Sequence, residues 1–397
     1  MGSNMQDEIN NEVPGPRNPP ERKGLEEIYK ALDERDQESR LDAPSESMLA
    51  EIDSEVLRER EREFRDVEKH WVRKNGWLRI VKEIAAKKSK VLGKPTGIRY
   101  LTLPGYYRLD VSLLLQNHLI EVTEADDSGN PKEIYVAGFE AELTKFGRME
   151  TQMPKLKLFG AAKLEDALIS SRNKYYLQLK NLFPFDAINM DLTTSLTPRH
   201  EGPYSPTLKA IETIFQLQSG NGLPWALFLT FRNVHSEWET GAFDQLTTNL
   251  QSNLVEEPRA LEAFQKLYNR NRVDELRDSD PINCISQAVA KWLIDRAHAY
   301  GFTGTLENCY FYTRYNTAVP YSIYKHLMVF SRAEVNPAQI PTKTIPKQAW
   351  MSNDLVEAIN RHRPLDVERK LLEISDRAPN SLLDLKEEIN SLCKLVH

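Results

Sequence analysis

Two polar side chains close one apolar segment of the chain and could do chemistry there. The segment covers residues 185–190, and Asn189 and Asp191 stand two positions apart at its end. Residues i and i+2 of an extended strand lie on the same face of a sheet, so both side chains would point to one side. Asp191 could instead cap a turn. We favour a catalytic or binding site, because the carboxylate follows a mostly apolar strand.

Other candidate residues follow neighbouring apolar segments. Glu140 comes directly after residues 134–139, where a carboxylate can accept both hydroxyls of a ribose. Gly105 comes after residues 98–103, where a glycine lets a ligand approach the backbone at a helix N-terminus. The alternatives are a solvated carboxylate that begins a helix and a glycine that only permits a tight turn. Arg232 and Asn233 end a further apolar segment and could hold a carboxylate or phosphate, or simply contact solvent.

Short apolar runs that alternate with helical patterns must position these residues. Five runs read as parallel strands joined by crossover helices, and two later runs read as an antiparallel hairpin. We therefore predict an α/β fold with a seven-stranded, mostly parallel sheet, a C-terminal antiparallel hairpin, helices on both faces, and helical N- and C-terminal extensions. The strand candidates are residues 98–103, 134–139, 156–159, 185–190, 224–231, 309–313 and 321–330.

Composition divides the chain of 397 residues into four parts. We expect a disordered acidic tail over residues 1–46, a helical region over residues 47–96, the α/β domain over residues 97–332, and a proline-rich linker with a helical extension over residues 333–397. Residues 1–68 hold 20 acidic and 10 basic residues, which leaves 42 basic and 38 acidic residues for the rest. This small basic excess permits nucleic acid as a partner without requiring it.

Several classes of protein are excluded by pattern. We find no apolar run long enough to span a membrane and no signal peptide. The eight histidines form no metal-binding pattern, and Cys284, Cys309 and Cys393 are too far apart in sequence for a disulfide framework or a zinc site of their own. We therefore expect a cytoplasmic protein without a metal. Residues 93–96 lack the upstream glycine of a P-loop, which argues against nucleoside triphosphate hydrolysis.

Five parallel strands with crossover helices, followed by a terminal strand pair, resemble the class I S-adenosylmethionine-dependent methyltransferases. The resemblance covers residues 97–331. Residues 183–191 are similar to the family's fourth motif, an apolar strand with a polar or acidic end beside the methyl-transfer site. Glu140 corresponds to the family's acidic ribose ligand, and Gly105 stands where its glycine-rich turn falls.

The resemblance implies transfer of a methyl group from the sulfonium of S-adenosylmethionine to a substrate nucleophile. It places Asn189 and Asp191 at the junction of cofactor and substrate, and Glu140 at the ribose. The remaining assignments are Pro104, Gly105, Tyr106 and Ala161 as cofactor contacts, and Thr193, Arg232 and Asn233 as substrate contacts.

The first motif departs from the family pattern, because its turn has one glycine and two tyrosines. An alternative is therefore a catalytically inactive member of the fold that serves as a binding or scaffold subunit. Its protein partner would contact the acidic N-terminal helix or the C-terminal helices. A third reading is an α/β protein that binds another nucleotide at the same strand ends.

Overall fold

A computed structural model describes the chain from Val67 onward, with gaps. The described residues are 67–105, 108–123, 133–152, 155–160, 162–192, 194–197, 205–234, 238–314, 321–333, 348–377, 384–385, 387–389 and 391. The predicted tail, residues 1–46, lies outside them, as do residues 47–66 and 334–347.

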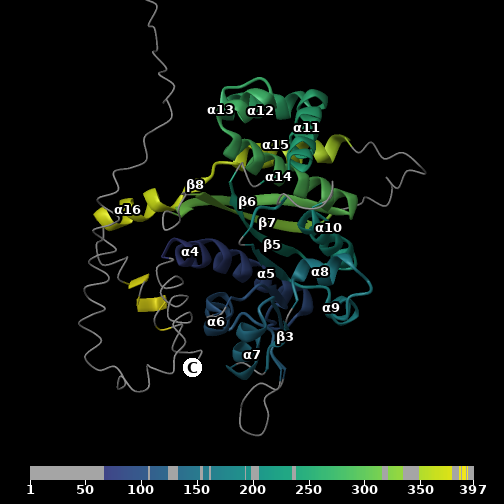
Figure 1. Ribbon diagram of the computed structural model, residues 1–397, viewed down its shortest axis with the longest axis vertical. Coiled ribbons are helices and arrows are strands. Elements are labelled where there is room, and N and C mark those ends of the chain that lie inside the picture. Colours follow the sequence, from purple (N-terminus) through teal and green to yellow (C-terminus); the bar gives the residue numbers. More distant parts are fainter. Residues whose placement is uncertain are drawn as a thin grey trace, which may run out of the picture.

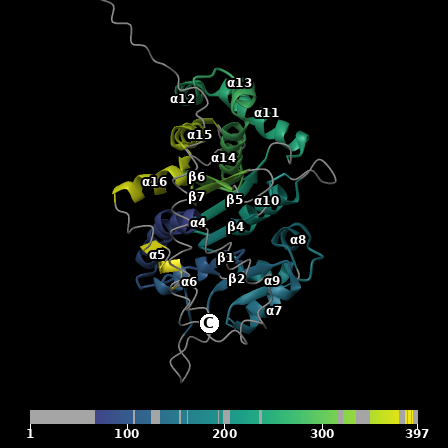
Figure 2. The same ribbon diagram turned by 60° about the vertical axis from the view of Figure 1, so that its left-hand side comes forward.

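One sheet of eight strands forms the centre of the described structure, in the order β3-β2-β1-β4-β5-β7-β6-β8. Figure 2 shows the part of this order from β2 to β6. The strands β1 to β5 are parallel, β7 is antiparallel to both β5 and β6, and β8 is parallel to β6. Their bounds are Tyr100–Thr102 (β1), Val136–Glu140 (β2), Lys157–Gly160 (β3), Ala187–Asp191 (β4), Trp225–Asn233 (β5), Phe302–Arg314 (β6), Tyr321–Arg332 (β7) and Leu365–Asp366 (β8).

The predicted α/β class is confirmed, including the mostly parallel sheet and the antiparallel strands near its C-terminal end. The number of strands is corrected from seven to eight, because Leu365 and Asp366 pair with Tyr310 and Phe311 as the short strand β8. A strand of two residues is too short to produce an alternating pattern, so β8 could not be predicted from the sequence.

Helices cover both faces of the sheet. Figure 1 shows α4 and α5 on one side of β5 and β7, and α14 and α15 on the other. The helices that share a hydrophobic core with the first face of the sheet are α4 (Val67–Val72), the π-helix η2 (Arg73–Trp77), α5 (Leu78–Leu92), α6 (Leu109–Gln116) and α16 (Val367–Arg377). Those on the second side are α8 (Leu164–Ile169), α9 (Tyr176–Leu182), α10 (Pro206–Gln218), α11 (Thr240–Glu256), α12 (Pro258–Tyr268), α13 (Val273–Ser279), α14 (Pro281–Ala299) and α15 (Gln348–Arg361).

Because helices cover both faces of the sheet, the strands appear in the sequence as continuous apolar runs. In β5, Leu227 and Leu229 belong to the core under α10 to α15, whereas Ala226 and Phe228 belong to the core under α4 to α6. Helix α10 begins at Pro206, because proline suits the first turn of a helix. The hydroxyl of Ser205 accepts a hydrogen bond from the Leu208 amide, and this bond caps the N-terminus of α10.

The helical region before the sheet packs closely on it. The indole of Trp77 stacks on Phe228, with ring centroids 5.3 Å apart and planes 2° from parallel. A Cβ on Gly76 would lie 2.7 Å from Leu327 of β7, so a glycine allows this approach of η2. Within the described ranges, no helix combines the length and the apolar composition needed to cross a bilayer.

Candidate functional site

The strand order reverses between β1 and β4, which makes this the switch point of the sheet. The carboxyl ends of these two strands lie side by side there. The Leu103 amide donates a hydrogen bond to the Asn189 carbonyl at 3.3 Å. Gly105 follows β1 with a φ of 59°, a backbone conformation that favours glycine. Pro104 lies against β2, since a Cβ on Gly138 would be 3.2 Å from its ring. Tyr106 is outside the described residues.

A buried carboxylate organises the polar groups at this switch point. Asp110, in the first turn of α6, accepts hydrogen bonds on Oδ2 from the hydroxyls of Tyr100 at 2.8 Å and Thr102 at 2.6 Å. The Asn189 amide nitrogen donates to the same oxygen at 3.2 Å. Burial, reinforced by the charge of Asp110, raises the pKa of Tyr100 well above its usual value. The amide nitrogen of Asn189 is therefore engaged, while its Oδ1 is buried without a hydrogen-bond partner among the described residues.

Asp191, the last residue of β4, forms a separate ionic group. Its Oδ2 lies 2.5 Å from Lys69 Nζ on α4, and its Oδ1 lies 3.7 Å from Lys325 Nζ on β7. Lys325 also donates to the Thr230 hydroxyl at 3.1 Å, and its ammonium is 4.9 Å from the centre of the Trp77 ring. Asp191, Thr230 and Lys325 are direct neighbours across β4, β5 and β7. The register of three strands therefore assembles this group.

The electrostatics of Asp191 favour the ionised carboxylate. Burial would raise its pKa, but the ammonium groups of Lys325 and Lys69, with the guanidinium of Arg73, outweigh that effect and hold the pKa far below its usual range. Asn189 and Asp191 thus lie on the same face of β4, as the sequence predicts. They have different partners, since one bonds to α6 and the other to α4 and β7.

Glu140 is the last residue of β2, and its neighbour on the adjacent strand β3 is Gly160. Its Oε1 accepts the Glu142 amide at 2.8 Å, so this carboxylate also shapes the turn into α7 (Leu143–Gln152). The Phe146 ring covers Gly160 so closely that a Cβ there would be 2.2 Å from it. An aromatic side chain therefore lies over the end of β3. Ala161 is outside the described residues.

Two of the predicted substrate contacts, Arg232 and Asn233, lie at the end of β5. Asn233 is buried and donates from Nδ2 to the Ile282 carbonyl at 3.2 Å, which ties β5 to the first turn of α14. The Arg232 amide donates to the Thr194 carbonyl at 3.1 Å. Thr193 lies outside the described residues. Asn233 thus has a structural partner, and the Arg232 side chain is half-buried at the strand end.

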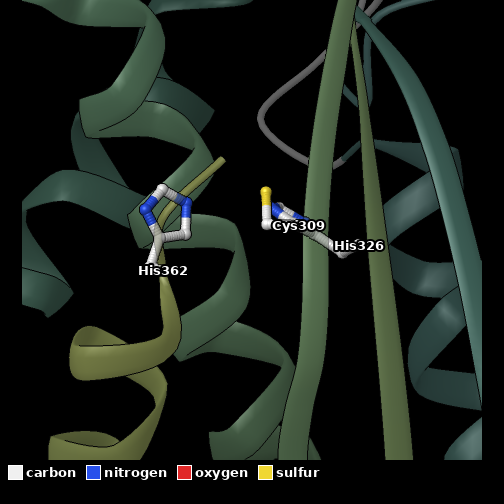
Figure 3. A group of neighbouring side chains, drawn as sticks. All are labelled: Cys309, His326 and His362. Atoms are coloured by element: carbon white, nitrogen blue, oxygen red, sulfur yellow. The ribbon is translucent and has the colours of Figure 1, made fainter. Parts of the chain in front are cut away.

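A second polar cluster lies on the opposite face of β7. Figure 3 shows Cys309 of β6 and His326 of β7 turned toward His362, which follows α15. All three side chains are buried, and one possible ligand atom from each lies within 4.8 Å of the others. Burial lowers the pKa of His362 to about 3, and burial with the neighbouring His362 lowers that of His326 well below its ordinary value. Both rings are therefore neutral near pH 7.

Sequence analysis missed this cluster and the two lysines around Asp191. The Cys and His residues come from three separate elements, so they produce no spacing motif. One signal was present, because Lys325 and His326 interrupt an otherwise apolar strand. A buried charged or polar side chain needs a partner, which indicates polar groups on both faces of β7.

The fold is that of a doubly wound α/β protein whose strand order reverses between β1 and β4. Residues 140–362, more than half of the chain, match the family described as PP_RS20740-like, and the chain belongs to that family. This description names no activity. A search of curated proteins finds no match to the sequence.

Proposed function

We propose that this protein binds S-adenosylmethionine between the carboxyl ends of β1 and β4 and transfers its methyl group to a substrate. The sheet topology is the main support for this proposal. At the switch point the Leu103 amide donates to the Asn189 carbonyl, and Gly105 follows two residues later with a left-handed backbone. Open α/β sheets bind their ligands at such a point. Five parallel strands followed by an antiparallel pair also agree with the resemblance described above.

In this proposal the cofactor extends along the ends of β1 and β2. Pro104, Gly105 and Tyr106 contact the methionine end, Glu140 accepts the ribose hydroxyls, and Ala161 faces the adenine. Asn189 contributes its buried Oδ1, which has no hydrogen-bond partner among the described residues. Thr193, Arg232 and Asn233 face the substrate, whose identity the proposal leaves open.

Methyl transfer from a sulfonium depends on positioning and electrostatics rather than on a covalent enzyme intermediate. Asp191 is held ionised by its two lysines, which makes it a weak proton acceptor. Because Lys69 and Lys325 already match its charge, its role would be to fix the end of β4 at the junction of cofactor and substrate. Asn189, held by Asp110, would orient the reacting groups.

Calorimetric titration of the full chain with S-adenosylmethionine and S-adenosylhomocysteine tests the proposal. We expect micromolar binding, and a loss of about tenfold or more in Glu140→Ala, because the ribose would lose a charged hydrogen-bond acceptor. The matched control is Glu142→Ala, which removes a nearby carboxylate and should bind as the wild type does. Absence of heat and of thermal stabilisation at millimolar ligand would overturn the cofactor assignment.

A second candidate function is a catalytically inactive subunit of this fold that binds a partner protein. The ion pairs of Asp191 favour it, because Lys69 brings helix α4 onto the end of β4. The variant Lys69→Met separates the two functions. If neither it nor the wild type binds the cofactor while both remain folded, the inactive subunit becomes the better proposal. Cofactor binding by either protein would support the methyltransferase.

The cellular setting of this function is also a proposal. We place the protein in the cytoplasm, with a protein partner that contacts the acidic N-terminal region or the C-terminal helices. Of these surfaces, α16 belongs to the described structure, where it packs against α4 and β6. Nucleic acid stays a candidate substrate because the body of the chain carries a small basic excess.

A further inference from the structure

The cluster of Cys309, His326 and His362 takes no part in the proposed methyl transfer. It lies on the face of the sheet under α14 and α15, whereas the Asp110 and Asp191 groups lie on the face under α4 and α6. His326 and Lys325 are consecutive residues of β7, so their side chains point to opposite faces. A separate explanation is therefore needed for three polar side chains brought together in a hydrophobic core.

A fourth polar group stands at the centre of the cluster. The hydroxyl oxygen of Ser286, on α14, lies 2.8 Å from His326 Nε2, 2.8 Å from His362 Nε2 and 3.8 Å from the sulfur of Cys309. One sulfur, two imidazole nitrogens and one oxygen thus converge from α14, β6, β7 and the end of α15. Cysteine and histidine are common zinc ligands, and zinc in proteins is usually four-coordinate, so the three side chains supply all but one of its ligands.

The ring of His362 is oriented by partners outside the cluster. Its Nδ1 is 2.7 Å from the hydroxyl of Tyr268, and that hydroxyl donates to Gln287 Oε1 at 3.1 Å. The hydroxyl oxygen of Tyr268 therefore accepts a hydrogen bond from Nδ1–H of His362, which leaves a lone pair on Nε2 directed at the centre. Metal-binding histidines are usually fixed in this way through their second nitrogen.

The hydrogen bonds within the cluster leave one group unexplained. His326 Nδ1 is fully buried and has no hydrogen-bond partner among the described residues. Buried polar atoms without a partner are rare in native proteins, and an ion bound through Nε2 would leave Nδ1 in the same state. The Ser286 hydroxyl has a single proton, so it can donate to only one of its three neighbours.

We propose that Cys309, His326 and His362 bind a zinc ion, with the Ser286 hydroxyl in the fourth position. Zinc bonds of about 2.0–2.3 Å would place the ligand atoms about 3.3–3.8 Å apart. Cys309 and the two histidines must therefore close by roughly 1 Å, while the Ser286 hydroxyl must move back by about 0.5 Å from the two Nε2 atoms. As the Zn–S bond forms, the thiol proton of Cys309 leaves to solvent. The imidazoles bind as neutral ligands, and no other bond changes.

Such a site would be structural, because all three ligands are buried and no substrate could reach the ion. It would fasten the C-terminal end of α15 to β6 and β7. His362 lies three residues before β8, so the ion would also hold the edge strand that the sequence did not predict.

The metal content of the full chain, purified without a histidine tag or chelator, tests this proposal. We expect about one zinc per chain in the wild type and a nearly complete loss in Cys309→Ser. The matched control is Cys284→Ser, since Cys284 is another buried cysteine and its sulfur faces the Val273 carbonyl instead. This variant should retain its zinc.

A second measurement uses only the wild type, in case Cys309→Ser does not fold. Chelator-treated protein should melt roughly 5 °C lower, and zinc should restore the melting temperature. Cobalt(II) in place of zinc should give the absorption of a thiolate–cobalt bond. Wild-type protein that contains no zinc and takes up neither ion would overturn the proposal. Zinc retained by folded Cys309→Ser, or stoichiometric copper in place of zinc, would overturn it equally.

Discussion

The ammonium of Lys69 lies 2.5 Å from Oδ2 of Asp191, which joins helix α4 to the carboxyl end of β4. Lys325 approaches the other carboxylate oxygen from β7, at 3.7 Å. The side chain of Lys325 is only 1% exposed, so its charge depends on Asp191 for compensation. The carboxylate that sequence analysis assigned to the methyl-transfer site is thus also a structural ion-pair partner.

Asp191→Asn should destabilise the protein by about 3–5 kcal/mol, because it leaves the buried ammonium of Lys325 without its counter-charge. Denaturant unfolding followed by circular dichroism measures this loss. Lys74→Met is the control, since Lys74 forms a comparable pair with Glu388 but is 44% exposed. Its loss should stay below about 1 kcal/mol. Equal losses in the two variants would show that Lys325 does not need Asp191.

The free energy of unfolding should decrease as the pH falls, because of His70 on α4. Burial, reinforced by the positive charge of Arg73, lowers the pKa of His70 from 6.5 to about 4. Between these two values the unfolded chain binds a proton that the folded chain does not. His70 should therefore lower the free energy of unfolding by about 1 kcal/mol per pH unit as the pH falls through this range.

Chemical unfolding at several pH values between 7.5 and 4.5 measures this slope. His70→Gln should unfold with a smaller pH dependence, because it removes the group whose protonation differs between the two states. His118→Asn, at an exposed position, should keep the slope of the wild type. A slope that His70→Gln leaves unchanged would assign the pH dependence to other groups.

Gly160→Ala should destabilise the protein by about 1–3 kcal/mol, because the new methyl group would overlap the Phe146 ring. A second substitution, Phe146→Leu, should recover part of that loss by making room for the methyl group. Thermal unfolding of the two single variants and the double variant measures the coupling. Additive losses would show that the two residues do not compete for the same space.

Asp110→Ala should cost more stability than the loss of any one of its hydrogen-bond donors. It would leave the buried groups of Tyr100, Thr102 and Asn189 without their shared acceptor, at a cost of about 3 kcal/mol or more. Tyr100→Phe removes one donor and should cost about 1 kcal/mol. Unfolding in urea compares the two variants, and equal losses would contradict the role of Asp110 as the organising acceptor.

The sequence alone determined the sheet and the approximate places of its strands. Apolar runs such as residues 185–190 are buried on both faces, so their composition carries the strand signal directly. The cap at Ser205-Pro206 and the turn at Gly105 were predictable for a similar reason, because each depends on neighbouring residues only.

Tertiary structure alone decided which side chains meet. Asp191 and Lys69 are far apart in the chain, and so are Cys309 and His362. No local pattern relates such residues, since their proximity depends on strand register and on how α4 and α15 pack on the sheet. Burial then gives these contacts their energy, because a charge or polar atom removed from water interacts strongly with the partner that the fold supplies.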